Sequence, residues 1–264
     1  MPRESVGMAD NIPKCVACAR VEEYIGMDLP ILYEDDLIVA VDKPSGVMTH
    51  PDGHTLDGTV SDWFGERYPD SKGVGETQKL KDGSEIMRPG IVHRLDRDTS
   101  GVMILCKTPE SHAFFKKAFQ EHVIRKTYLA FVYGTPKEPK GTITFAIGRS
   151  RKDFRLRSAQ PKAKGQMREA ITQYSTVGSI GTHTLLKVMP ETGRTHQIRV
   201  HLKAIHHPVV CDALYAPNHP CDLGFTRLGL HAAQLEIHLP DNSAVVINSP
   251  VPPELQAAYK RFVP

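Results

Sequence analysis

The chain has 264 residues, of which 40% are hydrophobic and 24% are charged, and its formal net charge is +3. This length accommodates one large domain or two small ones, and the composition is typical of globular proteins. No apolar run approaches 18 residues and no apolar core follows the N-terminus. The sequence therefore predicts neither a membrane-spanning helix nor a signal peptide, and we expect a cytoplasmic protein without a membrane partner.

The five cysteines are scattered along the chain and odd in number, which favours a reducing compartment over a disulfide framework. Cys15 and Cys18 form one C-x-x-C pair, the spacing of half a zinc site. The other cysteines supply no matching second pair, and they are Cys106, Cys211 and Cys221. We therefore expect neither a metal site nor a disulfide framework.

The N-terminal third combines a tail, a buried strand and a surface loop. Residues 1–28 show no convincing periodicity and are interpreted as a tail or arm that precedes one domain over residues 29–264. The apolar run 37–41 predicts a buried strand that ends in a Pro-Gly turn. Residues 54–68 are interpreted as a helix, and residues 70–90, rich in Gly, Lys and Asp, as a surface loop.

A polar loop rich in arginine lies between a Pro-Gly turn and a strongly apolar strand, in the stretch from Arg88 to Thr108, RPGIVHRLDRDTSGVMILCKT. Residues 102–106 predict a buried strand, which would anchor the loop. Asp96 has arginines on both sides in the sequence, and an arginine partner in space would lower its pKa and keep it ionised, as a nucleophile or base requires. An ordinary salt-bridged loop aspartate remains the alternative at this point.

The middle of the chain predicts a helix followed by a strand. Thr108, Pro109 and Glu110 form a helix start, because they supply an N-cap, a proline at the first helical position and an acid in the first turn. Four residues then fall on one helical face and are expected in the core: Phe114, Phe115, Ala118 and Phe119. Residues 126–134 form a β-branched and aromatic strand that contains Tyr128.

Positive charge is concentrated between Arg149 and Arg168. This segment contains one acid, Asp153, and eight basic residues: Arg149, Arg151, Lys152, Arg155, Arg157, Lys162, Lys164 and Arg168. A charge run is commonly just a solvated face. The imbalance here favours a loop that contacts phosphates.

Residues 193–202, GRTHQIRVHL, predict a helix capped by Thr195. Ile198 and Leu202 would share a face that docks on the core, while Arg199 lies on another face that can look into a cleft. Two histidines in this helix lie five positions apart, not the three or four of a helical metal pair, so a histidine metal site is not expected.

The remaining segments are interpreted as scaffold. Residues 184–189, 233–239 and 245–247 predict strands, and Pro252 and Pro253 open a final helix.

Several of these stretches, taken in order, resemble the RluA-type pseudouridine synthases, which isomerise uridine in structured RNA. HRLDRDTSG around Asp96 resembles the catalytic loop, KTYLA the tyrosine motif and GRTHQIRVHL the third motif, while LIVAVDKPSGVMTHP is similar to the first. The resemblance covers roughly Ile31 to Phe262. It implies one α+β domain, with a mixed, largely antiparallel central sheet flanked by helices and an active cleft across it.

The resemblance also implies an isomerase that converts specific uridines to pseudouridine. Ribosomal RNA is the first candidate for its substrate, and transfer RNA is the second. Asp96 would be the catalytic aspartate, Tyr128 would contact the base, and Arg199 would pair with Asp96. The residues expected to bind substrate are Arg94, Arg194, His196, Gln197 and Lys43. The reaction involves no redox step or hydrolysis, so neither a metal nor an organic cofactor is expected. We expect the protein to be a monomer that recognises RNA with this domain.

The stretch HHPVVCDALYA departs from the family, because His206 and Cys211 stand where glycine is common. If these positions require positive φ, the turn is expected to be rebuilt here.

Two other functional classes are the alternatives. A non-catalytic RNA-binding protein of the same fold would be favoured by loss of Asp96 or Tyr128, and both are present. An unrelated hydrolase could use Asp96 with His93, but the sequence shows no nucleophile elbow and no metal-ligand spacing.

Overall fold

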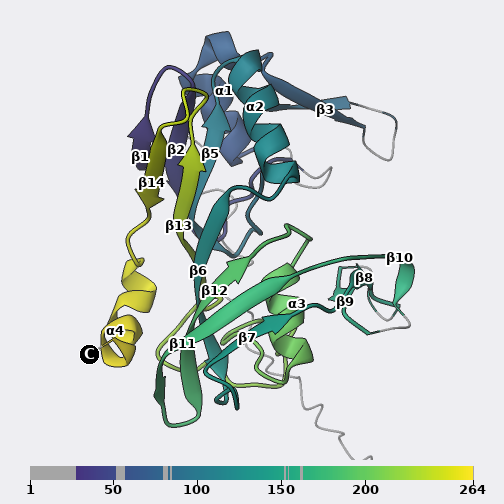
Figure 1. Cartoon of the computed structure of the whole chain (residues 1–264), viewed down its shortest axis with the longest axis vertical. Helices are drawn as coiled ribbons and strands as arrows, with labels where there is room; N and C mark the ends of the chain where they lie inside the picture. Colours follow the sequence, from purple (N-terminus) through teal and green to yellow (C-terminus); the bar gives the residue numbers. More distant parts are fainter. Residues whose placement is uncertain are drawn as a thin grey trace, which may run out of the picture.

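The computed structural model describes residues 28–51, 57–79, 83, 85–151, 153, 155–160 and 163–263. Its main element is a nine-stranded sheet, counted over these residues (Figure 1). The strands are β1 (Ile31–Glu34), β2 (Ile38–Lys43), β5 (Ser100–Cys106), β6 (Arg125–Tyr133), β7 (Lys140–Ile143), β11 (Thr172–Ile180), β12 (His183–Pro190), β13 (Leu230–His238) and β14 (Ala244–Asn248). Their order is β1-β2-β5-β13-β6-β12-β11-β7, with β14 paired to β13. The pairing of β5 with β13 is parallel and the other pairings described for this sheet are antiparallel, so the predicted α+β class with a largely antiparallel sheet is confirmed.

Helices cover both faces of this sheet. They are α1 (Val60–Arg67), α2 (Pro109–Gln120), α3 (Gln197–Ala204) and α4 (Pro253–Phe262), with a short 3-10 turn at Pro69–Ser71. Over the described residues, none of them has the length and apolar content needed to cross a membrane. The predicted start of α2 is confirmed, since Thr108 and Ser111 form a capping box around Pro109.

Two helix layers pack side by side on one face of the sheet. On one face α1 packs against β2 and β5, while α3 packs against β6 and β12. Tyr128 contacts both of these clusters. On the opposite face of β6 and β12 lies α4. Tyr128 therefore projects at the boundary between the α1 and α3 layers.

The expected surface loop over residues 70–90 is largely a hairpin. β3 (Gly75–Lys79) pairs with β4 (Glu85–Pro89) from Gly75 opposite Pro89 to Lys79 opposite Glu85. A Cβ on Gly75, whose φ is +138°, would lie 2.4 Å from the Arg88 carbonyl oxygen, so only glycine fits this close approach. The sequence hid the hairpin because β3 is polar throughout and offers no alternating apolar face.

Three further expectations need correction. The helix predicted over 54–68 begins at Val60, with Thr59 and Asp62 forming its capping box, and residues 52–56 lie outside the described part. Phe114, expected in the core, is 37% exposed, whereas Phe115 is fully buried. Thr195 does not cap α3, because the helix begins two residues later.

The basic segment forms a small sheet instead of a loop. Its strands are β8 (Ile147–Arg149), β9 (Arg157–Ser158) and β10 (Lys164–Arg168), in the order β10-β8-β9 (Figure 1). Lys152, Phe154 and Lys162 lie outside the described residues.

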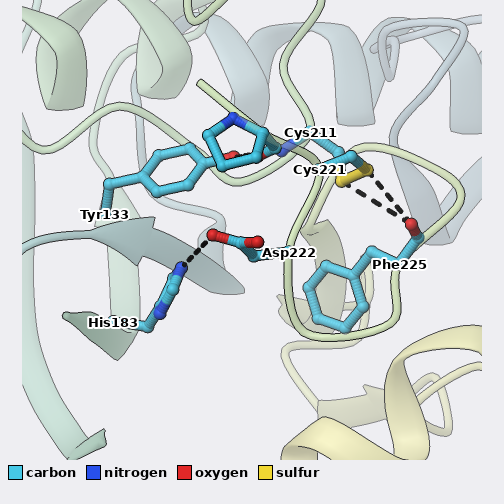
Figure 2. Close-up of a disulfide and its surroundings, with 7 residues drawn as sticks. Tyr133, His183, Cys211, Cys221, Asp222 and Phe225 are labelled. Atoms are coloured by element: carbon cyan, nitrogen blue, oxygen red, sulfur yellow. Dashed lines mark hydrogen bonds and ion pairs between the residues drawn. A yellow bond between two sulfur atoms is a disulfide. The ribbon is translucent and has the colours of Figure 1, made fainter. Parts of the chain in front are cut away.

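The structure pairs Cys211 with Cys221 in a disulfide, contrary to the expectation from the cysteine count (Figure 2). Cys106 is a free, buried thiol, and Cys15 and Cys18 lie outside the described residues. The turn expected to be rebuilt keeps its left-handed conformation, because His206 has φ +67° and Cys211 has φ +57°.

Candidate active site

The three residues predicted to be catalytic line one cleft of about 630 Å³. Asp96 comes from the loop that precedes β5, Tyr128 from β6 and Arg199 from α3. The central position of β5 and β6 in the sheet, on either side of β13, holds the loop and the tyrosine against the α3 layer. Residues that are up to 103 positions apart in sequence are thereby brought together.

Arg199 lies between two carboxylates. Its Nη1 is 3.6 Å from Asp96 Oδ2, and its Nε and Nη2 each donate at 2.7 Å to the two oxygens of Asp212. Burial opposes the charge of the guanidinium, but the hydrogen bonds and charge of Asp212 outweigh it and raise the pKa of Arg199. Arg199 is thus permanently charged and held in a fixed orientation, with one nitrogen free to face Asp96.

Asp212 was missed from the sequence. It is fully buried, and its Oδ1 also accepts hydrogen bonds from the backbone nitrogens of Leu214 and Tyr215. An acidic residue directly after the apolar run Val209-Val210-Cys211 was the available signal, since a buried carboxylate requires a partner.

Tyr128 keeps its phenolic proton at neutral pH. Burial, with a further contribution from the Asp96 carboxylate, raises the pKa of Tyr128 above its usual value of 10. Its backbone pairs with Ala232 on one side and Val188 on the other, so the ring is fixed by the centre of the sheet. Tyr128 can therefore pack on a base and donate a hydrogen bond, but it is not a base itself in the resting site.

The backbone of the Asp96 loop is held in place by the side chain of Thr49. Thr49 Oγ1 donates to the Leu95 carbonyl at 2.9 Å and accepts from the Leu95 nitrogen at 3.3 Å. Arg94, an exposed residue that lines the cleft, lies with its Nη1 3.2 Å from His50 Nε2. Its place at the rim is compatible with the predicted contact to RNA.

Lys43 does not line the cleft, and the predicted contact with substrate does not fit its position. Its side chain is fully buried, and its ammonium donates to the carbonyls of Pro44, Val47 and Arg97 at 2.9, 2.7 and 3.0 Å. Burial lowers the pKa of Lys43 to about 7. The lysine thereby joins the turn after β2 to the backbone of Arg97, the residue next to Asp96.

Gln197 is also occupied within the protein. Its Oε1 accepts from Thr192 Oγ1 at 2.7 Å and from the Arg194 nitrogen at 2.9 Å. Its Nε2 donates to the Ile171 carbonyl and to Thr172 Oγ1, both at 3.0 Å. The amide therefore shapes the cleft wall, and it has no group left over for the predicted substrate contact.

His196 and Arg194, which were predicted to contact substrate, both line the cleft. His196 occupies the N-cap of α3 with φ +56°, and its Nδ1 lies 2.8 Å from the Tyr215 hydroxyl. Burial lowers the pKa of His196. Arg194 donates through Nε to the Glu169 carbonyl at 3.0 Å.

Two further residues line the cleft: His93, the histidine of the hydrolase alternative, and Lys126, which the sequence did not single out. The ring of His93 stacks on Phe119 at 4.4 Å, and its Nε2 accepts from the Ile104 nitrogen at 2.9 Å. Burial lowers the pKa of His93 to about 3, so this histidine stays neutral and its Nε2 is taken. A hydrolase that uses His93 as its base finds no support in this geometry. Burial lowers the pKa of Lys126 to about 8.

Within the described residues, histidine, cysteine, aspartate and glutamate side chains do not gather in groups of three or more that could hold a metal ion.

Comparison with known proteins identifies relatives along nearly the whole chain. Residues 37–204 match the family described as RNA pseudouridylate synthase. An uncharacterized RNA pseudouridine synthase of Synechocystis is 38% identical over 243 residues, which covers 92% of this chain and 71% of that protein. The ribosomal large subunit pseudouridine synthase D of Vibrio parahaemolyticus is 32% identical over 270 residues, which covers 97% of this chain and 78% of that protein. The solved structure of human RNA pseudouridylate synthase domain containing 1 has the same fold, with a TM-score of 0.66 at 24% identity and coverage of 87% of this chain and 86% of that one.

Proposed function

Since the chain belongs to the RNA pseudouridine synthase family, whose members isomerise uridine to pseudouridine, we propose that it uses Asp96 to modify a flipped-out uridine in structured RNA, with ribosomal RNA as the first candidate. The observation that carries the proposal is the convergence of Asp96, Tyr128 and Arg199 in one cleft.

The reaction breaks the bond between N1 of uracil and C1′ of ribose, turns the base over and joins C5 to C1′. The proton on C5 then leaves, so the reaction is redox-neutral and needs one group that attacks or abstracts a proton. Asp96 is a carboxylate that lines the cleft with Arg199 beside it, and both covalent attack and proton abstraction are open to it. Arg199 would aim this carboxylate, and Tyr128 would pack on the uracil.

The position of Asp96 supports the proposal that the uridine is flipped out of its helix. The side chain of Asp96 is only 16% exposed. A uracil that is stacked within an RNA helix cannot reach a carboxylate that is buried in this way. Arg94 at the rim could fill the gap left in the RNA.

Ribosomal RNA is favoured because the Vibrio relative is named for the large ribosomal subunit and aligns with 97% of this chain. Transfer RNA is the second candidate.

The test is to map chemically labelled pseudouridines in ribosomal and transfer RNA from cells with and without the gene. The proposal expects a site in ribosomal RNA that disappears with the gene and returns with the wild-type gene, but not with Asp96→Asn. Sites that vanish from transfer RNA alone would move the substrate to that class. An unchanged map, together with purified protein that binds RNA without modifying it, would favour the non-catalytic RNA-binding protein instead.

A further inference from the structure

The loop from Cys211 to Cys221, here named the 211–221 loop, is closed by a disulfide between its two ends (Figure 2). The two Cα atoms lie 4.6 Å apart although ten positions separate them in sequence. Cys221 is exposed, so the disulfide can be reached from solvent.

This loop supplies the groups that hold Arg199. Asp212, next to Cys211, binds the guanidinium through both of its oxygens. The Tyr215 ring lies 5.0 Å from the guanidinium carbon, and the Tyr215 hydroxyl is 2.8 Å from His196 Nδ1. Movement of the loop would therefore shift the arginine that faces Asp96.

Cys211 is in a backbone conformation that costs energy for any residue with a Cβ. Its φ is +57°, in the left-handed region that favours glycine. Two contacts restrain Cys211: the disulfide to Cys221, and a hydrogen bond of 3.3 Å that the Cys211 backbone nitrogen donates to the Tyr133 hydroxyl. Opening the disulfide removes one of these restraints and leaves the unfavourable φ.

The open form also has partners for both thiols. The Phe225 carbonyl oxygen lies 3.1 Å from Cys221 Sγ and 3.8 Å from Cys211 Sγ, so either thiol finds an acceptor there once it gains a proton (Figure 2). Both states of the pair are therefore compatible with a folded chain.

We propose that Cys211 and Cys221 are a reversible thiol–disulfide site that controls activity through the position of Arg199. The inference rests on the proposed role of Arg199. A dithiol reductant attacks one sulfur to form a mixed disulfide, and its second thiol closes to release the protein. The protein gains two electrons and two protons as two thiols, and the reductant becomes a cyclic disulfide. A small-molecule disulfide drives the reverse reaction. The oxidised loop holds Arg199 in place, and the reduced loop releases it.

The test compares oxidised and dithiothreitol-reduced protein, with Cys15 and Cys18 replaced by serine in every sample to remove other thiol pairs. Peptide mass mapping establishes the state of Cys211 and Cys221 before each assay. Reduction is expected to lower kcat by about three- to tenfold, on the scale of the cost of a left-handed residue, while KM for RNA changes little. Cys221→Ser should behave like the reduced protein in either buffer.

Cys211→Gly is the matched variant, because glycine adopts the positive φ freely without a disulfide. It should retain the kcat of the oxidised protein and lose its response to reductant. A general loss of stability could not produce this rescue.

Equal kcat in the oxidised and reduced states would overturn the inference, as would a peptide map in which the pair stays reduced after treatment with a small-molecule disulfide. If neither state forms pseudouridine, the proposed function fails on its own. The redox site is then judged by the midpoint of thermal unfolding, which must be several degrees higher for the oxidised protein than for the reduced one, with no such difference in Cys211→Gly.

Discussion

At the level of single residues, the site depends on Arg199, whose guanidinium contacts two carboxylates at unequal distances. The contacts of Arg199 with Asp212 are both 2.7 Å, whereas its nearest approach to Asp96 is 3.6 Å. Asp212 therefore fixes the orientation of the Arg199 guanidinium. Asp96 feels the positive charge of this guanidinium, while the oxygens of Asp96 stay available for chemistry. A lysine at position 199 would keep the positive charge but lose the two-pronged contact with Asp212, and so should separate the effect of charge from the effect of orientation.

Arg199→Lys is expected to lower kcat at least about tenfold, because an ammonium cannot bind both oxygens of Asp212 and still face Asp96. KM for RNA should change less, since Arg199 is largely buried and Asp212 binds its guanidinium. Arg97→Lys, at an exposed arginine of the Asp96 loop, is the control and should retain wild-type kcat. Turnover of Arg199→Lys equal to that of the control would exclude the positioning role.

Lys126 should give the binding of RNA a dependence on pH. Burial lowers the pKa of this lysine to about 8, so its positive charge is present below that pH and is lost as the pH rises through it. KM for RNA should therefore increase between about pH 7 and about pH 9, since a polyanion favours the protonated form. Lys126→Arg, which stays charged, should flatten the profile. Parallel profiles for the two proteins would show that Lys126 does not contact RNA.

Some residue roles could be predicted from the sequence and others could not. Asp96 was predicted to be catalytic because its contiguous loop resembles a family motif, whereas the loop composition alone left an ordinary salt-bridged aspartate open. Lys43 lies in the first family motif and Gln197 in the third, yet polar atoms of both bind backbone groups of distant segments. Such partners are created by folding and leave no pattern in the local sequence.

Among the elements, the basic segment forms a small sheet of β8, β9 and β10 that lies beside α3 (Figure 1). Arg168 from β10 lines the same cleft as Asp96. The segment is therefore placed where RNA that enters the cleft would pass, which supports the predicted phosphate contacts over a merely solvated face.

Replacing Arg151 and Arg155 together with alanine should raise KM and flatten the plot of log affinity against log salt, by about 0.7 to 0.9 for each phosphate that the variant no longer neutralises. Turnover at saturating RNA should change far less, because neither residue lines the cleft around Asp96. Lys260→Ala with Arg261→Ala on α4 is the matched control, since this helix packs on the opposite face. Filter-binding titrations at several salt concentrations measure the slopes. If the two double variants have equal slopes, the RNA follows another path.

Elements with a strong apolar pattern or a clear cap were predictable, and polar strands were not. β5 and α2 were predicted because one is an unbroken apolar run and the other begins with Thr108 and Pro109. β3 and β10 escaped because their residues are largely exposed, and their pairing is fixed by a partner strand instead of burial. Without such an apolar pattern, the sequence could not distinguish these strands from loops.

A buried polar contact joins the two strands that pair in parallel, and it affects the stability of the whole molecule. His231 of β13 lies with Nδ1 2.9 Å from Ser100 Oγ at the start of β5, and its side chain has no exposed surface. Burial lowers the pKa of His231 to about 4, from 6.5 in an exposed histidine. The neutral ring is thus the form that the fold accommodates.

The free energy of unfolding should fall as the pH drops from about 6.5 to about 4. In this window the unfolded chain binds a proton at His231 and the folded chain does not, so protonation favours unfolding, by up to about 3 kcal/mol for this group. His231→Gln keeps a polar group without the titration and should show a shallower decline. Urea titrations at about pH 7 and about pH 4.5 measure the decline in both proteins, and identical declines would assign the acid sensitivity to other groups.

The fold and the meeting of Asp96, Tyr128 and Arg199 were predictable because the motifs occur in the order and spacing of a known family. Asp212 and the disulfide between Cys211 and Cys221 were not. Both depend on the path of one loop over the α3 layer, which motif spacing does not specify.

The central claim is that Asp96 performs the isomerisation, and the release of tritium from RNA labelled at C5 of uridine measures it most directly, because that hydrogen leaves when C5 bonds to C1′. Asp96→Asn removes the charge without changing the volume, and Asp98→Asn applies the same change to a neighbouring, more exposed aspartate. The account predicts that Asp96→Asn loses more than about a hundredfold in rate, about 2.7 kcal/mol in barrier, while Asp98→Asn stays close to wild type and both variants remain folded. A rate for Asp96→Asn within about tenfold of wild type would contradict it.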